Sequence, residues 1–115
     1  MAPSATSATH GNTSLTDEQL RTLREMLEEQ RAFRLDQLEQ LRREEAASPN
    51  GDREIRESLM TGARAALREV IEALARMQDG RYGTCRQCSQ PLPVARLEVL
   101  PQLALCMDCQ RALEA

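Results

Sequence analysis

Apolar and polar positions recur with the period of an α-helix through the first half of the chain. Between residues 17 and 46 there is no Gly or Pro, and leucines at helical spacing share one stripe roughly 120° wide. The leucines are Leu20, Leu23, Leu27, Leu35, Leu38 and Leu41, and the polar residues that interrupt them are Gln30, Arg31 and Arg34. A long helix with one narrow apolar face needs a partner.

The start of this helix carries its own local signal. Thr16 and Gln19 have the spacing of a capping box, and Leu15 and Leu20 have the spacing of a hydrophobic staple. We therefore expect the helix to begin directly after Thr16.

A break follows at residues 47–52. Pro49 and the pair Asn50-Gly51 are strong turn signals. Asp52 is placed to cap a second helix.

The second helix is expected to reach about Asp79, because Gly80 suits the left-handed position just past a helix end. Leu67 and Ile71 widen its apolar stripe toward this end. The stripe itself consists of Ile55, Leu59, Ala63, Ala66, Val70, Leu74 and Met77.

Two helices of about 30 and 27 residues joined by about six predict an antiparallel hairpin. At ~1.5 Å per residue each arm is roughly 40–45 Å long. Each helix buries only its stripe on the other, so the hairpin is a rod. Periodicity alone leaves a plain coiled-coil spacer or a dimerisation arm equally open.

Composition narrows the class of protein. The net charge is −3, all fifteen basic residues are Arg, and the aromatic residues are Phe33 and Tyr82 alone. Neither a basic stripe nor a set of stacking aromatics is present, so direct sequence-specific DNA binding is not expected. The single histidine, His10, has no nucleophile–base arrangement around it, so the protein is not expected to be an enzyme.

No run approaches the ~18 apolar residues of a membrane span, and residues 1–14 lack the features of a secretory signal. We therefore expect a cytoplasmic protein with no membrane association. Residues 1–14 are too poor in apolar groups to join a core and are predicted to be a disordered arm.

The four cysteines fall in two close pairs with the pattern C-x2-C-x17-C-x2-C. They are Cys85, Cys88, Cys106 and Cys109. In a reducing compartment this spacing indicates a zinc site more than a disulfide or redox pair. Four protein thiolates leave no open coordination position, so the single zinc ion is expected to be structural.

Residues 80–115 are thus predicted to be a small zinc module behind a hairpin of residues 15–79. Between the cysteine pairs, residues 96–99 and 103–105 have the length of a small hairpin turning at Pro101, and residues 110–115 predict a short C-terminal helix. A small core is expected around the metal, made of Leu97, Val99, Leu100, Leu105 and Leu113. The predicted fold is mainly α: a long antiparallel two-helix coiled-coil hairpin plus a four-cysteine zinc finger.

The finger has a recognisable motif of about 32 residues. It comprises Asp79-Gly80-Arg81-Tyr82-Gly83-Thr84-Cys85-Arg86-Gln87-Cys88, then Pro91-Leu92-Pro93-Val94-Ala95-Arg96-Leu97, then Pro101 and Cys106-Met107-Asp108-Cys109-Gln110. This motif resembles the DksA/TraR four-cysteine zinc-finger family. The preceding long hairpin is also similar to that family, which extends the likeness to about residues 16–115.

The resemblance implies a bacterial transcription regulator that binds RNA polymerase rather than DNA. Family members insert a coiled-coil hairpin into the secondary channel of the polymerase, so that its tip approaches the active site. In this chain the tip-binding residues would be Asn50, Asp52 and Arg53, and we expect a monomer. The alternative is a zinc-stabilised coiled-coil adaptor for another protein partner.

Two positions depart from the family pattern. Family tips carry two acidic residues in a D-x-x-D-x-A arrangement, and Asp52 matches the second of them while Pro, Ser or Ala stands at the first. Ser89 replaces the Gly that usually follows the second cysteine, which requires a backbone that avoids a strained conformation.

Overall fold

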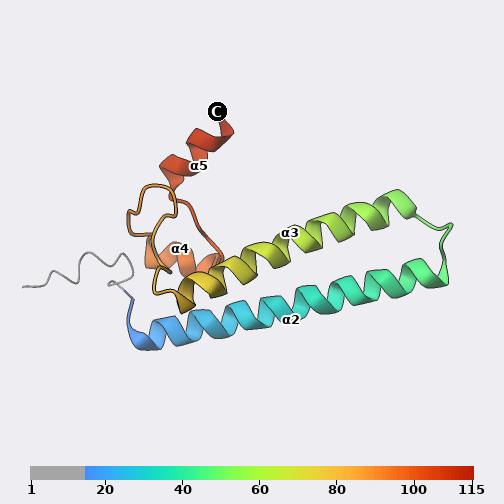
Figure 1. The fold of residues 1–115 in the computed structure, drawn as a ribbon, viewed down its shortest axis with the longest axis horizontal. Coiled ribbons are helices and arrows are strands. Elements are labelled where there is room, and N and C mark those ends of the chain that lie inside the picture. Colours follow the sequence, from blue (N-terminus) through green and yellow to red (C-terminus); the bar gives the residue numbers. More distant parts are fainter. Residues whose placement is uncertain (1–14) are drawn as a thin grey trace, which may run out of the picture.

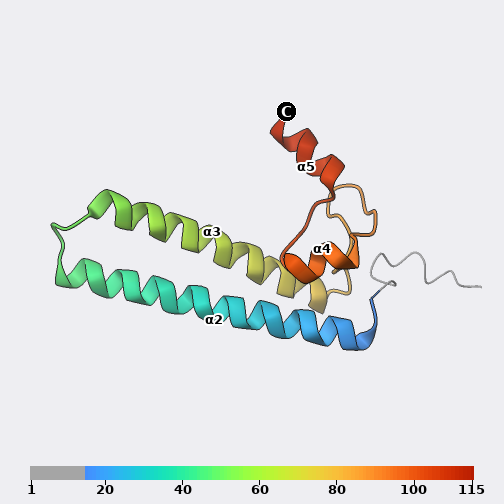
Figure 2. The ribbon, with the colours of Figure 1, turned by 180° about the vertical axis from the view of Figure 1, so that it is seen from behind.

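The computed structural model describes residues 15–115. Two long helices, α2 (Asp17–Ala47) and α3 (Arg53–Gln78), run antiparallel and lie side by side in both views (Figures 1 and 2). Two short helices, α4 (Val94–Val99) and α5 (Met107–Glu114), follow at the end of the hairpin far from its tip. The molecule is 65 Å long and 34 Å by 21 Å across. The predicted mainly helical fold is confirmed.

The first residues described form a capped helix start. The backbone N–H of Gln19 donates to Thr16 Oγ1 at 3.0 Å, and the backbone N–H of Thr16 donates to Gln19 Oε1 at 2.9 Å. Leu15 is buried in the core and Leu20 packs against it. The predicted capping box is therefore confirmed, and the predicted arm of residues 1–14 lies outside the described residues.

The connection between the long helices is a short exposed turn. The backbone N–H of Ser48 donates to Glu44 O at 2.9 Å, and that of Gly51 donates to Ser48 O at 3.1 Å. Asp52 occupies the N-cap position of α3, yet its side chain makes no capping hydrogen bond. The expectation that Asp52 caps this helix through its side chain is wrong, since its carboxylate is left exposed to solvent.

The end of α3 follows the sequence signal. Gly80 has φ +74°, the left-handed conformation that glycine adopts at least cost. The backbone N–H of Arg81 donates to Arg76 O at 2.8 Å and closes the last turn. This turn directs the chain back toward the zinc module.

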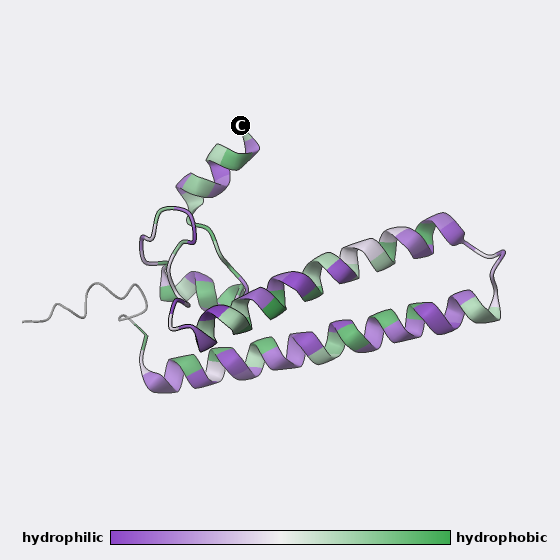
Figure 3. Cartoon of the chain, viewed as in Figure 1, coloured by the Kyte–Doolittle hydropathy of each residue, from purple (hydrophilic) through white to green (hydrophobic). Residues whose placement is uncertain are grey.

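The core gathers at the base of the hairpin, where the zinc module covers it. Hydrophobic bands alternate with hydrophilic ones along both long helices (Figure 3). The buried members of the core come from α2, from α3 and from the module. They are Leu15, Leu23, Leu27, Val70, Ala73, Tyr82, Cys85, Leu92, Leu97 and Leu105.

The predicted apolar stripes are only partly buried. Leu35 on α2 is exposed. On α3, Ile55 is 60% exposed and Leu59 is 49% exposed, and Ile71 is exposed as well. Ile55 and Ala73 are 18 residues apart, which is five helical turns, so they share a flank of α3. Ala73 is fully buried in the core that the zinc module completes, whereas nothing in the described chain covers Ile55. The sequence pattern therefore marks apolar positions along α3, and it does not show which of them the zinc module covers.

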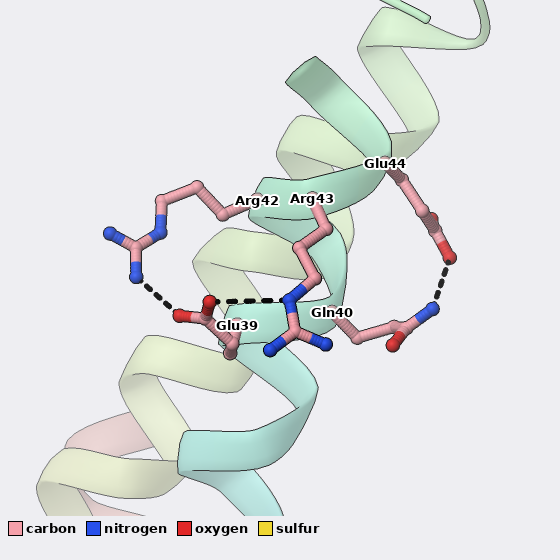
Figure 4. Close-up of polar contacts among 5 residues, drawn as sticks. All are labelled: Glu39, Gln40, Arg42, Arg43 and Glu44. Atoms are coloured by element: carbon pink, nitrogen blue, oxygen red, sulfur yellow. Dashed lines mark hydrogen bonds and ion pairs between the residues drawn. The ribbon is translucent and has the colours of Figure 1, made fainter. Parts of the chain in front are cut away.

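The outer surface of α2 carries solvated ion pairs. Glu39 pairs with Arg42 and, at 3.4 Å, with Arg43, and Gln40 donates to Glu44 at 3.5 Å (Figure 4). The hydrogen bond from Arg42, followed by its charge, lowers the pKa of Glu39. Pairs this exposed contribute little to stability. In the part of the chain described, no helix has the length and apolar character needed to cross a membrane.

The predicted hairpin at residues 96–105 is wrong, because its first half is helix α4. Pro93 at the N-cap has φ −61°, already suited to a helix start, and the backbone N–H of Leu97 donates to Pro93 O at 3.1 Å. Within residues 15–115 the β structure is a single isolated bridge between Thr84 and Pro91. Pro93 therefore starts a helix where the sequence predicts a strand of a hairpin.

Candidate metal centre

The first cysteine pair sits on a tight turn. The backbone N–H of Ser89 donates to Cys85 O at 2.8 Å, and that of Cys85 donates to Gln90 O at 2.8 Å. These bonds close the loop around Cys88 and bring both sulfurs to one side. The backbone N–H of Arg86 donates to Ala104 O at 2.9 Å, which ties this turn to the segment leading to the second pair.

The second pair straddles the start of α5. Cys106 is the N-cap, and its Sγ accepts from the backbone N–H of Cys109 at 3.4 Å. The backbone N–H of Gln110 donates to Cys106 O at 2.9 Å. The helix start thus orients Cys106 and Cys109 toward the same point.

The four sulfurs fit a single tetrahedral ion. All four Sγ atoms lie within 4.8 Å of one another, and those of Cys88 and Cys106 are 3.7 Å apart. A tetrahedron with Zn–S bonds of ~2.3 Å has edges of about 3.8 Å. The four cysteines are therefore poised to bind one metal ion, as the sequence spacing predicts.

The surroundings of the sulfurs favour a bound cation. Burial raises the pKa of the Cys85 thiol, but backbone N–H groups, that of Cys106 foremost, outweigh burial and lower it to about 6. The neighbouring sulfur of Cys106 instead contributes most to raising the pKa of Cys109, to about 12. Thiolates at this spacing repel one another, and a divalent ion at their centre removes that repulsion.

Three side-chain polar contacts hold the zinc module, one of them within the module and two between the module and α3. Tyr82, fully buried, donates its hydroxyl to Pro101 O at 2.8 Å. Arg76 of α3 reaches Leu103 O at 3.4 Å, and Arg86 lies 3.9 Å from the carboxylate of Glu72. The tyrosine contact is the shortest and the most buried of the three.

Tyr82 should make stability fall at alkaline pH. Burial raises the pKa of its phenol to about 12, while in the unfolded chain the phenol ionises near 10. The protonated phenol therefore contributes its full share to the free energy of unfolding below pH 10. As the pH rises from 10 to 12, the free energy of unfolding falls by about 2–3 kcal/mol. Denaturant unfolding at each pH measures this loss, and absorbance of this single tyrosine follows its ionisation.

The matched variant is Tyr82→Phe, which removes only the hydroxyl. It should be less stable at neutral pH by about 1–2 kcal/mol, because Pro101 O loses its partner. Its stability should then be unchanged between pH 10 and 12. A parallel decline in both proteins would show that other groups cause the alkaline loss.

The small core around the metal differs from its prediction. Leu97 and Leu105 are buried as expected, but Val99, Leu100 and Leu113 are exposed. The fully buried residues that complete it are Tyr82, Leu92 and Pro101. Because residues 94–99 form a helix and α5 stands away from the body (Figure 1), the side chains of Val99 and Leu113 point to solvent.

Ser89 has φ +66°, the left-handed backbone conformation that glycine adopts at least cost, so the expected unstrained backbone is not found here. Ser89→Gly should therefore raise the free energy of unfolding by up to about 1 kcal/mol, because it removes the strain of this conformation. The greater conformational entropy of glycine in the unfolded chain offsets part of this gain. Ser89→Val, with a branched side chain, should lower it by about 1–2 kcal/mol. Urea unfolding of zinc-loaded protein compares the two, and equal stability would argue against strain at this position.

The residues predicted to bind a partner lie at the opposite end of the molecule. Asn50, Asp52 and Arg53 are exposed in the turn between α2 and α3 or directly after it (Figure 1). Arg53 Nε lies 3.4 Å from Glu57. Since α3 has 26 residues, roughly 40 Å of helix separates this tip from the cysteine cluster.

Comparison with known proteins gives a family for the finger. Residues 80–115 match the family described as "Prokaryotic dksA/traR C4-type zinc finger". General stress protein 16O of Bacillus subtilis is 39% identical over 51 residues, which cover 44% of this chain and 31% of that protein. The RNA polymerase-binding transcription factor DksA of Caulobacter vibrioides is 31% identical over 64 residues, covering 56% of this chain and 45% of that protein.

These matches span between about a third and a half of the curated relatives. The structural likeness is longer. The structure of transcription factor DksA2 from Pseudomonas aeruginosa matches with a TM-score of 0.73 at 25% identity, over 85% of this chain and 84% of that one. The similarity therefore includes the helical rod as well as the cysteine cluster.

Proposed function

Because this chain is a DksA-like member of the DksA/TraR zinc-finger family, we propose that it regulates transcription by binding RNA polymerase. The hairpin enters the secondary channel and its tip approaches the active site. The protein acts in the cytoplasm, as a monomer and without catalysis of its own. Direct recognition of DNA is no part of this proposal.

The observation that carries the proposal is the extent of the likeness. The match to the DksA2 structure covers 85% of this chain, more than the finger or the hairpin alone could supply. A finger shared alone would fit a generic adaptor equally well. A shared rod of this length supports insertion into a deep, narrow site.

Each end of the molecule has a separate role in this proposal. Cys85, Cys88, Cys106 and Cys109 hold one structural zinc, which fixes the start of α5 to the loop that carries the first cysteine pair. The zinc supplies folding energy and takes no part in chemistry. The tip residues Asn50, Asp52 and Arg53 make the contacts that alter transcription, and the exposed Glu44, Glu45 and Glu54 add negative charge beside them.

The test measures binding of the full zinc-loaded chain to purified core RNA polymerase. The fluorescence anisotropy of a dye attached to the zinc module reports this binding. One chain per polymerase is expected, together with a change in transcription in vitro. A gel shift with promoter DNA alone serves as the control and should show no submicromolar binding. If the chain failed to bind polymerase, the regulator proposal would be lost and the adaptor for another protein would replace it.

A further inference from the structure

The two halves of the hairpin are packed very differently. All described residues of the hydrophobic core cluster lie within residues 15–27 or 70–109, and so do the partly buried residues packed against it. Between these limits, in residues 28–69, the buried apolar side chains are Leu41 and Ala63 alone. We call residues 30–66 the tip half and the remainder of the hairpin the base half.

A buried cation lies in the first turn of α3, next to the tip. Arg56 is only 7% exposed, and its Nη2 has no hydrogen-bond partner among the described residues. It precedes Ala63 and Val70 by seven and fourteen residues, so it lies on the same buried face of α3. A buried donor left without a partner costs free energy, and more so when it is charged.

The facing part of α2 is also polar. Gln30, Arg34 and Gln37 are half-buried there, with Arg34 Nη1 donating to Gln37 Oε1 at 2.9 Å. The Arg34 guanidinium lies 5.3 Å from the centre of the Phe33 ring. Arg34 and Gln37 thus bond to one another within α2, and these three polar side chains take half-buried positions that apolar groups could fill.

Several bulky apolar groups of the tip half lie outside the interface, although Leu41 is buried and Leu38 and Met60 are half-buried. Phe33, Leu35, Ile55 and Leu59 are all exposed, so their burial contributes little to holding the helices together. Gly62 lies in the middle of α3 with nothing within 4 Å of where a Cβ would stand. Glycine at an open helical position weakens the helix, and no close contact compensates.

From these observations we propose that the tip half is a separate unit of low stability, which opens locally while the base half stays folded. Arg56 is the residue that keeps it weak. Opening exposes the Arg56 guanidinium to water and uncovers little apolar surface, so its cost is small. The tip can then adjust its shape to a partner without loosening the zinc module. The inference concerns the free chain and stands whether or not polymerase is the partner.

The test is amide hydrogen exchange of the full zinc-loaded chain, read by mass spectrometry on peptides from each half. Amides within residues 38–44 and 56–64 should exchange about 100-fold faster than those within residues 23–28 and 70–76. The inference would be overturned by protection that is even along both helices, or higher in the tip half.

A pair of variants isolates the role of Arg56. Arg56→Met keeps a long side chain and removes the charge, and it should slow exchange in the tip half about tenfold while the base half is unchanged. Arg64→Met makes the same change at an exposed position of α3 and should alter neither half. Faster or unaltered tip exchange in Arg56→Met would overturn the role assigned to Arg56.

Discussion

Cys109→Ser is expected to release the metal and unfold residues 80–115 while α2 and α3 stay largely helical. A structural zinc contributes on the order of 10 kcal/mol to a small module, far more than the few leucines around this one supply. Cys109 also anchors α5, none of whose residues is buried. Losing α4 and α5 removes 14 helical residues, while the 57 of α2 and α3 remain.

Metal analysis and circular dichroism measure this result together. Zinc should fall from one per chain to none, and the helical signal should fall by roughly a fifth. Gln87→Ser is the matched control, because Gln87 is exposed between Cys85 and Cys88 and should leave both values unchanged. Full zinc occupancy in the cysteine variant, or collapse of the whole helical signal, would contradict the account.

Asp52→Asn is expected to abolish the effect on transcription without weakening polymerase binding or stability. Asparagine keeps the shape of aspartate and removes its charge. Within residues 15–115 the exposed Asp52 side chain makes no capping hydrogen bond, so removing its charge should cost little stability. The zinc module and the rod still dock, so affinity should stay within about twofold, less than 0.5 kcal/mol.

Transcription in vitro and a binding assay, run on the same preparations, separate the two effects. The control is Asp36→Asn, which makes the same change at an exposed position halfway along α2 and should behave as wild type. If Asp52→Asn regulated normally, Asp52 would have no role in the channel. If it lost binding instead, the tip would contribute to docking rather than to regulation.

Local signals in the sequence predicted the elements well. The Thr16–Gln19 capping box, the helix end at Gly80 and the cysteine pairs each depend on residues a few positions apart, and the structure confirms all three. Short-range hydrogen bonding and backbone preference decide such features, so they are encoded in the adjacent residues.

Features that depend on distant segments were less predictable. Ile55 and Ala73 share a flank of α3, but only the position of the zinc module determines which of them is covered. Arg56, a charged residue outside the predicted stripe, lies on the buried face. The periodic pattern indicates which face of a helix is apolar. It does not indicate how far the segment packed against that face extends along the helix.

The residues around the metal show the same limit. Tyr82 was recognised only as part of a motif, yet it is fully buried and bonded to Pro101, 19 residues away. Leu113 has the hydrophobicity of a core residue, but α5 holds it in solvent. Hydrophobicity alone cannot place a side chain when a metal ion, rather than packing, fixes the backbone.

Site-specific crosslinking from the tip tests the central claim most directly. A photoreactive amino acid replaces Asn50, which is exposed in the turn, and the zinc-loaded protein is irradiated with purified RNA polymerase. Peptide mapping should place the crosslinks on residues that line the secondary channel near the active site. Crosslinks confined to the outer surface of the polymerase, in a complex that forms and is active, would contradict insertion of the tip.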